Sequence, residues 1–238
     1  HNGDTATVLG NTGSLVRTGY SFTGWNTAAN GSGTSYTGGD TFGITTSSVT
    51  LYAQWTAVDY TVTYDGNTNT GGSVPTDGNT YNITDTVTVL GNTGSLVKTG
   101  YSFTGWNTAA NGSGTSYNGG DTFAMGSSNV TLYAKWTENV YSVTYNGNGN
   151  TGGSVPVDAT TYHNGDTATV LGNTGSLVRT GYSFTGWNTA ANGSGTSYTG
   201  GDTFGITTSS VTLYAQWTAV DYTVTYDGNT NTGGSVPT

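Results

Sequence analysis

The sequence predicts a mainly β protein built as a tandem array of small modules, and three observations carry the prediction. The segment GYSFTGWNTAANGSGTSY occurs at Gly19, Gly100 and Gly181, and VTLYAQW or VTLYAKW follows each copy, so the repeat period is 81 residues. Apolar and polar residues alternate within these segments, as they do in half-buried strands. The chain also has 6 Trp, 17 Tyr and 6 Phe, which supply enough aromatic surface for several small cores.

Composition limits the classes of partner. The 238 residues include 40 Gly and no Cys, only 7% are charged, and the net charge is −9. Low charge with much Gly is typical of disorder when aromatic residues are scarce, and here they are not. Four basic residues against 13 acidic ones argue against nucleic acid and anionic lipid as partners. No apolar run is long enough to cross a bilayer, so we expect no membrane insertion.

The repeat sets the expected module boundaries near Val58 and Asn139. Residues 58–138 and 139–219 are complete repeats, residues 1–57 lack the first strand, and residues 220–238 repeat only that first strand. Residues 1–76 are identical to residues 163–238, so two slightly different units alternate with a super-period of 162 residues. Identity that extends through the loops favours recent duplication, which a single active site would not require.

The first half of a complete repeat predicts two strands. Tyr60, Val62 and Tyr64 alternate with threonines and fall on one face of a first strand. A Gly-, Asn- and Thr-rich loop follows, and residues 86–90 form the second strand. No stretch has a convincing helical period, and we expect at most one short helical turn, at NTGSLVKT.

The second half predicts a third strand, a hairpin and a closing strand. Strict alternation along residues 100–106 places Phe103 and Trp106 on opposite faces. An Asn-Gly turn signal follows, residues 121–123 extend a short strand, and residues 130–136 close the unit. The apolar side chains of the closing strand share one face: Val130, Leu132, Ala134 and Trp136.

These segments resemble a known family. GYSFTGWNTAANGSGTSY followed by VTLYAKW, with YTVTYDGN before them, is similar to the Listeria–Bacteroides repeat, also called the internalin B-repeat type. The resemblance spans essentially the whole chain, although this chain has fewer charges and more Thr, Asn and Gly than typical members. It implies a small β-grasp-like module, found in tandem in bacterial and some archaeal surface proteins as a spacer, stalk or adhesive segment. It implies no catalytic residue and no cofactor.

The ionisable residues do not predict an enzyme. Glu138 is the only glutamate, and His1 and His163 occupy a repeat position at which the middle unit has Asn82. Acid–base catalysis needs two such groups held together in a pocket. The recurrent aspartates precede strands, where a carboxylate usually accepts backbone hydrogen bonds in a turn; they are Asp4, Asp85, Asp166, Asp40, Asp121 and Asp202.

One loop is a weak calcium candidate. Asp65, Asn67 and Asn69 place oxygen atoms at alternate positions, as at the start of a calcium loop. The glutamate expected later in such a loop is absent, and Asn146 replaces Asp65 in the next unit. A polar hairpin loop is the plainer interpretation.

The tryptophans have two interpretations. An 81-residue module has little else from which to build a core, so we expect Trp25, Trp55, Trp106, Trp136, Trp187 and Trp217 to be core residues. The alternative is an array of glycan-binding modules that uses exposed aromatic rings, mainly the tyrosines on the opposite strand faces, Tyr52, Tyr133 and Tyr214.

The last segment is a candidate assembly strand that carries Tyr222, Val224 and Tyr226. An unpaired strand has free backbone donors and acceptors and half of an apolar face, so it requires a partner. It could close a ring within its own chain, complete residues 1–57 of a second copy, or belong to a longer covalent array. Strand exchange between copies is heterologous and propagates as a filament. The sequence favours a linear arrangement over a ring. Filament and covalent array are nearly equal, and the identity of residues 1–76 with residues 163–238 slightly favours the array. The expected function is a structural stalk, fibre or adhesin shaft, extracellular or at the cell surface, whose partner is itself and whose further ligands would be surface glycans.

Overall fold

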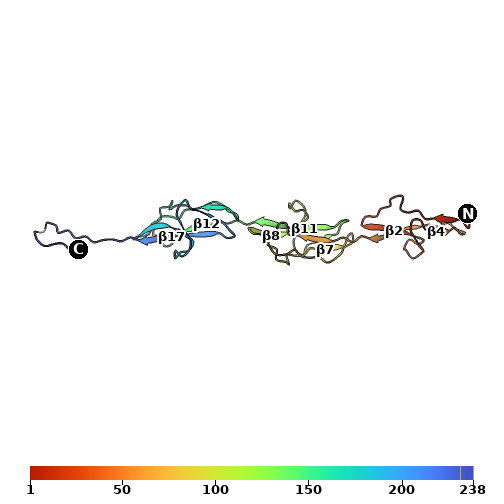
Figure 1. The fold of residues 1–238 in the computed structure, drawn as a ribbon, viewed down its shortest axis with the longest axis horizontal. Helices are drawn as coiled ribbons and strands as arrows, with labels where there is room; N and C mark the ends of the chain where they lie inside the picture. The colour runs from red at the N-terminus through yellow and green to blue at the C-terminus, as the bar shows by residue number, and fades with distance from the viewer. Residues whose placement is uncertain (231, 238) are drawn as a thin grey trace. The chain divides into compact units, whose positions relative to one another are not determined.

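The computed structural model describes residues 1–230 and 232–237. The regular structure of these residues is entirely β, with strands joined by turns and loops (Figure 1). The chain divides into two compact units, His1–Thr137 and Glu138–Thr238. The mainly β fold and the tandem repeat are confirmed, whereas no helix of the β-grasp type occurs among the described residues. The helical turn expected at NTGSLVKT is also absent, because the Asn92 side chain bonds both the N–H and the C=O of Leu96 and holds a loop there.

The complete module of the first unit has one four-stranded sheet and one separate strand pair. Sheet neighbours follow the order β6 (Val62–Asp65), β11 (Val130–Glu138), β8 (Tyr101–Asn107) and β9 (Ser116–Tyr117). The separate pair consists of β7 (Thr86–Thr88) and β10 (Thr122–Ala124), which run antiparallel. The two-residue strand β9 was not predicted.

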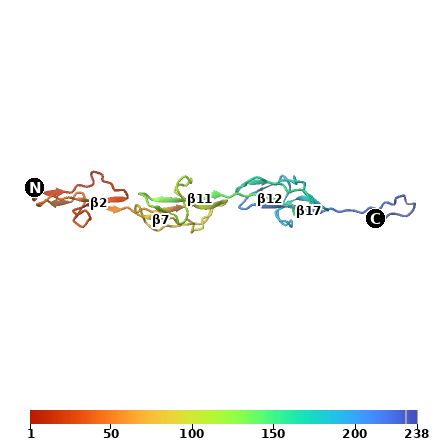
Figure 2. The same ribbon diagram turned by 180° about the vertical axis from the view of Figure 1, so that it is seen from behind.

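The second unit repeats this arrangement. Its sheet has the order β12 (Val143–Asn146), β17 (Val211–Ala219), β14 (Tyr182–Asn188) and β15 (Ser197–Tyr198), and its separate pair is β13 (Thr167–Thr169) with β16 (Thr203–Gly205). Strands β12 and β17 lie side by side in both views (Figures 1 and 2).

The first strand of each complete module pairs with its last strand, and the two run parallel. Val62 lies opposite Val130, and Tyr64 lies opposite Leu132. Parallel neighbours cannot be joined by a tight turn and need a long crossover; here almost the whole module forms the crossover. The two ends of the module's sequence therefore meet in its sheet, and the module is incomplete without either one.

A bulge corrects the predicted alternation in the third strand. Strand β14 has a register shift between Phe184 and Gly186, and in β8 the equivalent Gly105 has a φ of 123°. An extra residue in one strand turns the following side chains to the other face. The rings of Phe103 and Trp106 consequently lie against each other, 5.2 Å between centroids. The prediction that they occupy opposite faces was wrong.

Each complete module has its own apolar core. In the first unit the buried side chains come from the sheet, the β7–β10 pair and the segments that follow these two strands: Val62, Tyr64, Val87, Val89, Leu96, Trp106, Met125, Leu132 and Ala134. The second unit buries the equivalent set together with Tyr162. Each large apolar side chain buried in this way stabilises the fold by about 1.5–3 kcal/mol.

Residues 1–57 form the same module without its first strand. A pair of strands, β1 (Thr5–Thr7) and β4 (Thr41–Gly43), accompanies a three-stranded sheet ordered β3 (Ser35–Tyr36), β2 (Tyr20–Asn26) and β5 (Tyr52–Ala57). The last strand begins at Tyr52, whereas β11 begins at Val130, which is equivalent to Val49. Residues 49–51 are not in strand conformation because the strand that pairs with them in the complete modules is missing here.

Candidate functional site

The first candidate site is the open edge of the module formed by residues 1–57. A groove of about 320 Å³ lies where the first strand would pack, and its lining is mostly apolar: Ala6, Thr7, Val8, Leu9, Trp25, Phe42, Val49 and Leu51. The equivalents of Leu51 and Trp25 in the complete module, Leu132 and Trp106, are both 0% exposed. Here both side chains are only half-buried. Leu15, equivalent to the buried Leu96, is 45% exposed. The groove is therefore a part of the apolar core that is covered by the first strand in the complete modules and is open here.

The complete module shows what fills this space. The ring of Tyr64 lies 4.7 Å from that of Trp106, and the backbone N–H of Leu90 donates to the Tyr64 hydroxyl oxygen at 2.8 Å. Burial raises the pKa of the Tyr64 hydroxyl, and the hydrogen bond from Leu90 opposes this shift only in part. Tyr145 makes the same contacts with Leu171 and Trp187 in the second unit.

The loop after the first strand fastens it to the rest of the module. The amide of Asn67 donates to the carbonyl oxygens of Ala110 and Ala134, at 2.8 and 2.9 Å. The indole N–H of Trp136 donates to the carbonyl of Gly66 at 3.1 Å. These bonds join the first strand to the hairpin and to β11. They are repeated by Asn148 and Trp217 in the second unit.

The calcium candidates lie in this same loop. Asp65 Oδ1 accepts the backbone N–H of Asn67 at 2.7 Å, and the Asn69 amide donates to the carbonyl of Gly71 at 3.0 Å. All three side chains thus hydrogen-bond within the protein and shape a turn. No cluster of three or more potential His, Cys, Asp or Glu ligands occurs among residues 1–230 and 232–237.

The candidate assembly strand lies in the open. Tyr222, Val224 and Tyr226 are 80%, 78% and 59% exposed, and residues 221–228 are not in strand conformation. Their equivalents in the complete module include Val62 and Tyr64, which are 2% and 8% exposed. The segment thus carries side chains that are buried wherever the same sequence is paired.

The structure places the six predicted core tryptophans at two depths. Trp106 and Trp187 are 0% and 1% exposed and stand in the middle of their cores. The others are half-buried: Trp25, Trp55, Trp136 and Trp217. Among the tyrosines of the glycan alternative, Tyr52 is 42% exposed, while Tyr133 and Tyr214 are half-buried.

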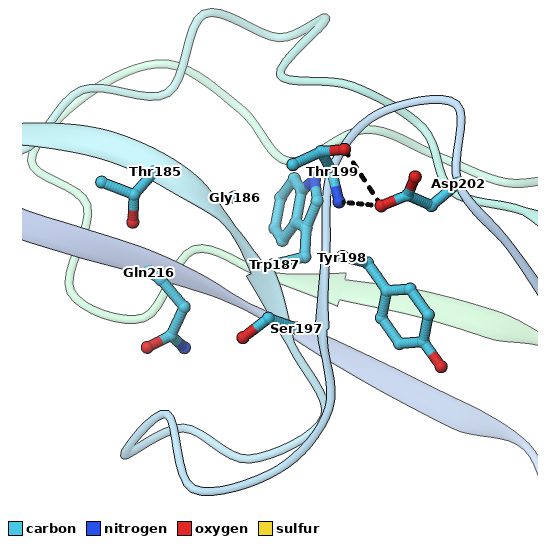
Figure 3. A pocket seen from close by; sticks show the side chains of 8 residues that line it. All are labelled: Thr185, Gly186, Trp187, Ser197, Tyr198, Thr199, Asp202 and Gln216. Atoms are coloured by element: carbon cyan, nitrogen blue, oxygen red, sulfur yellow. Dashed lines mark hydrogen bonds between the residues drawn. The ribbon is translucent and has the colours of Figure 1, made fainter.

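The recurrent aspartates accept turn hydrogen bonds. Asp202 Oδ2 accepts the backbone N–H of Thr199 at 2.6 Å and its hydroxyl at 3.0 Å, at the rim of a small pocket of about 140 Å³ (Figure 3). Both bonds lower the pKa of the Asp202 carboxyl, and the bond from the backbone N–H has the larger effect. Asp166 Oδ2 accepts the backbone N–H of His163 at 2.7 Å, and the imidazole lies 3.6 Å from the same oxygen.

Sequence reasoning missed the buried asparagine of each hairpin. Asn107 is 1% exposed; its Oδ1 accepts the N–H groups of Ala109 and Gly114, and its amide donates to the Ser116 hydroxyl at 2.9 Å. The amide also reaches the carbonyls of Gly112 and Gly114. One side chain thus organises the Gly-rich hairpin. The signal was its presence after Trp in all three copies.

A second candidate site, also unanticipated, is a polar pocket in the complete module of the first unit. Its volume is about 340 Å³, and its lining includes both lysines of the module, Lys98 and Lys135, together with Tyr101, Trp136 and Asn107. The ammonium of Lys98 lies 4.4 Å from the centroid of the Tyr101 ring. No carboxylate is among the lining residues.

Small β modules that close by joining their own two ends, repeated along one chain, define a modular repeat protein. The sequence profile of the Listeria-Bacteroides repeat domain matches residues 1–54, 60–135 and 141–216, and the chain belongs to that family.

Two relatives come from Evansella cellulosilytica. One is named as a Gly-rich membrane protein and is 36% identical over 99% of this chain and 26% of its own length. The other is named as a membrane protein and is 34% identical over 70% of this chain and 23% of its own length. Internalin H of Listeria monocytogenes is 36% identical over 52% of this chain and 20% of its own length. The chain thus spans about a quarter of the curated relatives it matches, and no solved structure matches it significantly. None of the described residues belongs to a helix that could cross a membrane.

Proposed function

We propose that the chain is a structural segment of an extracellular surface protein, a shaft of β modules that carries load or distance rather than catalysing a reaction. The observation that carries this proposal is the parallel pairing of first and last strand, which makes each complete module a closed unit, joined to the next by the chain itself. The family membership and the names of the relatives, two membrane proteins and an internalin, support a location at the cell surface.

We further propose that the segment 222–237 completes the open module of a second copy. The register follows from the complete module, in which Val62 lies opposite Val130 and Tyr64 opposite Leu132. Because the sequences are equivalent, Val224 would lie opposite Val49 and Tyr226 opposite Leu51. Strand addition of this kind supplies main-chain hydrogen bonds for affinity and side-chain pockets for specificity.

The side chains of the added strand have specific partners waiting. Tyr226 would enter the groove, pack on the Trp25 ring and accept the backbone N–H of Leu9, as Tyr64 does with Trp106 and Leu90. The Asn229 amide would donate to the two carbonyls of the open module that are equivalent to those bonded by Asn67. The indole N–H of Trp55 would donate to the carbonyl of Gly228. The donor surface differs from the acceptor surface, so each addition leaves a new free end and the assembly grows as a filament.

The length of the assembly tests the proposal. We expect the purified chain to form concentration-dependent linear oligomers in sedimentation velocity and in negative-stain electron microscopy. Deletion of residues 222–238 should leave monomers. Tyr226→Ala tests the groove with one substitution at an exposed residue. Thr225→Ala is its control, because the equivalent Thr63 stays exposed in the complete module. If the full chain and the deletion variant are monomers of equal stability, strand complementation is refuted, and a shaft made only by covalent linkage stands.

A second function, glycan binding, is supported by the polar pocket of the first unit. It combines amide groups and lysines, which suit hydroxyl and acidic groups, with the aromatic wall of Trp136 and Tyr101. A shaft that binds surface saccharides would act as an adhesin. A glycan panel read by tryptophan fluorescence separates this function from a purely mechanical one, since the mechanical shaft gives no saturable response.

A further inference from the structure

The pocket of about 340 Å³ in the complete module of the first unit differs from the corresponding region of the other modules at two lining residues. Lys98 is arginine in both other copies, and the difference at position 135 changes the shape of the pocket. Position 135 is Lys, whereas the flanking copies have Gln54 and Gln216. The Gln216 amide donates to the carbonyls of Tyr214 and Ala190, at 3.1 and 3.4 Å. The glutamine side chain thus lies over Ala190, which is equivalent to the pocket-lining Ala109.

The glycine at the hairpin turn shows the consequence. A Cβ atom placed on Gly193 would lie 2.9 Å from Gln216 Oε1, and Gly31 is covered by Gln54 at the same distance. Nothing lies within 4 Å of the corresponding position at Gly112. Lys135 turns away instead, and its ammonium lies 3.3 Å from the Ser116 hydroxyl. Replacing glutamine by lysine therefore uncovers the turn and opens the pocket.

The charge of the pocket is opposite to the charge of the chain. Two of the chain's four basic residues, Lys98 and Lys135, line it, and the lining has no carboxylate. The closest acids along the chain to a lining residue are Asp65 and Glu138, each two positions away. Asp65 Oδ1 already accepts the N–H of Asn67, and Glu138 Oε2 lies 3.9 Å from His163 Nε2. In a protein with 13 acidic residues, a pocket with two cations and no acid selects anionic ligands.

The neutral part of the lining specifies the rest of the ligand. Trp136 and the turn alanines form an apolar wall, suited to the C–H face of a sugar ring. The side chain of Asn111 and the turn backbone offer amide and carbonyl groups suited to hydroxyls, whereas Asn107 is already engaged in the hairpin. The volume lies at the lower end of the range of small-molecule sites, about 300–1,000 Å³.

We propose that this pocket binds a carboxylate-bearing saccharide, a uronic acid unit of a surface polysaccharide. Because of Lys135, the middle module is the one that binds this ligand. The proposal rests on the second function above, glycan binding, and is independent of the shaft. Lys98 would hold the carboxylate together with Lys135, whose ammonium would move to it from the Ser116 hydroxyl, while Trp136 packs against the ring. The flanking modules, with glutamine across the turn, would bind the ligand weakly or not at all.

Calorimetry with trigalacturonate at low salt tests the proposal on the whole chain. We expect one site per chain. Lys135→Gln, which restores the residue of the flanking modules, should weaken binding about tenfold, the effect of one lost charge-assisted hydrogen bond. Gln216→Lys should create a second site beside Arg179, so the stoichiometry doubles. Lys135 is exposed, so an unchanged urea midpoint will show that Lys135→Gln leaves the fold intact.

Two further ligands separate the outcomes. Methyl-esterified trigalacturonate keeps the sugar and removes the charge, and inorganic phosphate keeps a charge without the sugar. Equal binding of the ester, equal binding of phosphate, or undiminished binding by Lys135→Gln each overturns the proposal. If the original chain and Lys135→Gln bind the ester equally, the chain binds glycans but Lys135 has no role in it. If no saccharide binds, both the uronic acid site and glycan binding are refuted, and the proposal of a structural shaft is unaffected.

Discussion

The backbone N–H of Leu90 donates to the hydroxyl of Tyr64 across 2.8 Å, and this bond ties the first strand of the module to the segment that follows β7. It joins residues 26 positions apart, and the second unit reproduces it between Leu171 and Tyr145. A closed module therefore depends on a first-strand tyrosine. The same tyrosine in the last segment, Tyr226, is exposed.

Removing the Tyr64 hydroxyl should destabilise the complete module. Tyr64→Phe keeps the ring on Trp106 but leaves the N–H of Leu90 without its acceptor, at a cost of about 1–2 kcal/mol in the free energy of unfolding. Urea denaturation followed by tryptophan fluorescence measures it. Tyr222→Phe changes an exposed ring and serves as the control; equal midpoints for the two variants would contradict the role of the bond.

Alkaline pH should destabilise both complete modules. Burial raises the pKa of Tyr64 and Tyr145 above 10.0, the ordinary value that applies in the unfolded chain. Since the folded pKa is the higher one, the unfolded state loses its protons first. The contribution is fully present below pH 10 and is lost as pH rises through the folded pKa. Urea midpoints between pH 8 and pH 11 test this. A Tyr64→Phe/Tyr145→Phe double variant should lose less stability over that range, and an equal slope would count against the assignment.

The buried asparagine should be more important than its exposed neighbour. Asn107→Ala removes the acceptor of two backbone N–H groups, each costing about 1–3 kcal/mol when left unpaired. We expect the hairpin to lose protection in hydrogen exchange, with a lower unfolding midpoint. Asn111→Ala alters an exposed turn residue of the same hairpin and should cost much less. Equal losses would mean that the turn, and not Asn107, organises the hairpin.

The bulge should tolerate no side chain at its glycine. Gly105 has a φ of 123°, and a Cβ there would lie 2.7 Å from the carbonyl oxygen of Tyr117. Gly105→Ala should destabilise by at least about 1–3 kcal/mol from backbone strain alone. Gly126→Ala, where nothing lies within 4 Å, is the matched control. Unchanged stability of Gly105→Ala would show that the strand can shed the bulge.

The repeat and the alternation of apolar residues predicted most strands of the fold. Val62 and Tyr64 on the first strand, and Leu132 and Ala134 on the last, are buried together as their period indicates. The bulge at Gly105 was not predicted. Glycine in a strand marks either a bulge or a close approach of another backbone, and a prediction from strict alternation includes neither. The parallel pairing of first and last strands escaped because strand order depends on contacts 68 residues apart, as between Val62 and Val130.

The candidate sites were predictable to different degrees. The assembly segment follows from copying, since Tyr222 to Thr238 repeats a sequence found elsewhere in the chain. Its acceptor groove could be found only in the three-dimensional structure, because Trp25 and Leu51 come from segments far apart in the sequence. The polar pocket depends on which way residue 135 turns, and a Gln-to-Lys difference does not reveal that by itself. The buried role of Asn107 was hidden because Asn is also a common turn residue.

The most direct test of the central claim uses the absence of cysteine in the chain. Thr63 and Thr131 face each other on the paired strands, with hydroxyl oxygens 3.1 Å apart, and Thr225 and Thr50 are their equivalents. Under mild oxidation, Thr225→Cys/Thr50→Cys should give a ladder of disulfide-linked chains on a non-reducing gel. Thr63→Cys/Thr131→Cys should give an internal disulfide, and Thr225→Cys/Thr104→Cys, which joins the segment to a different strand, should give no ladder. A Thr225/Thr50 pair that stays unlinked while the internal pair closes would contradict strand complementation.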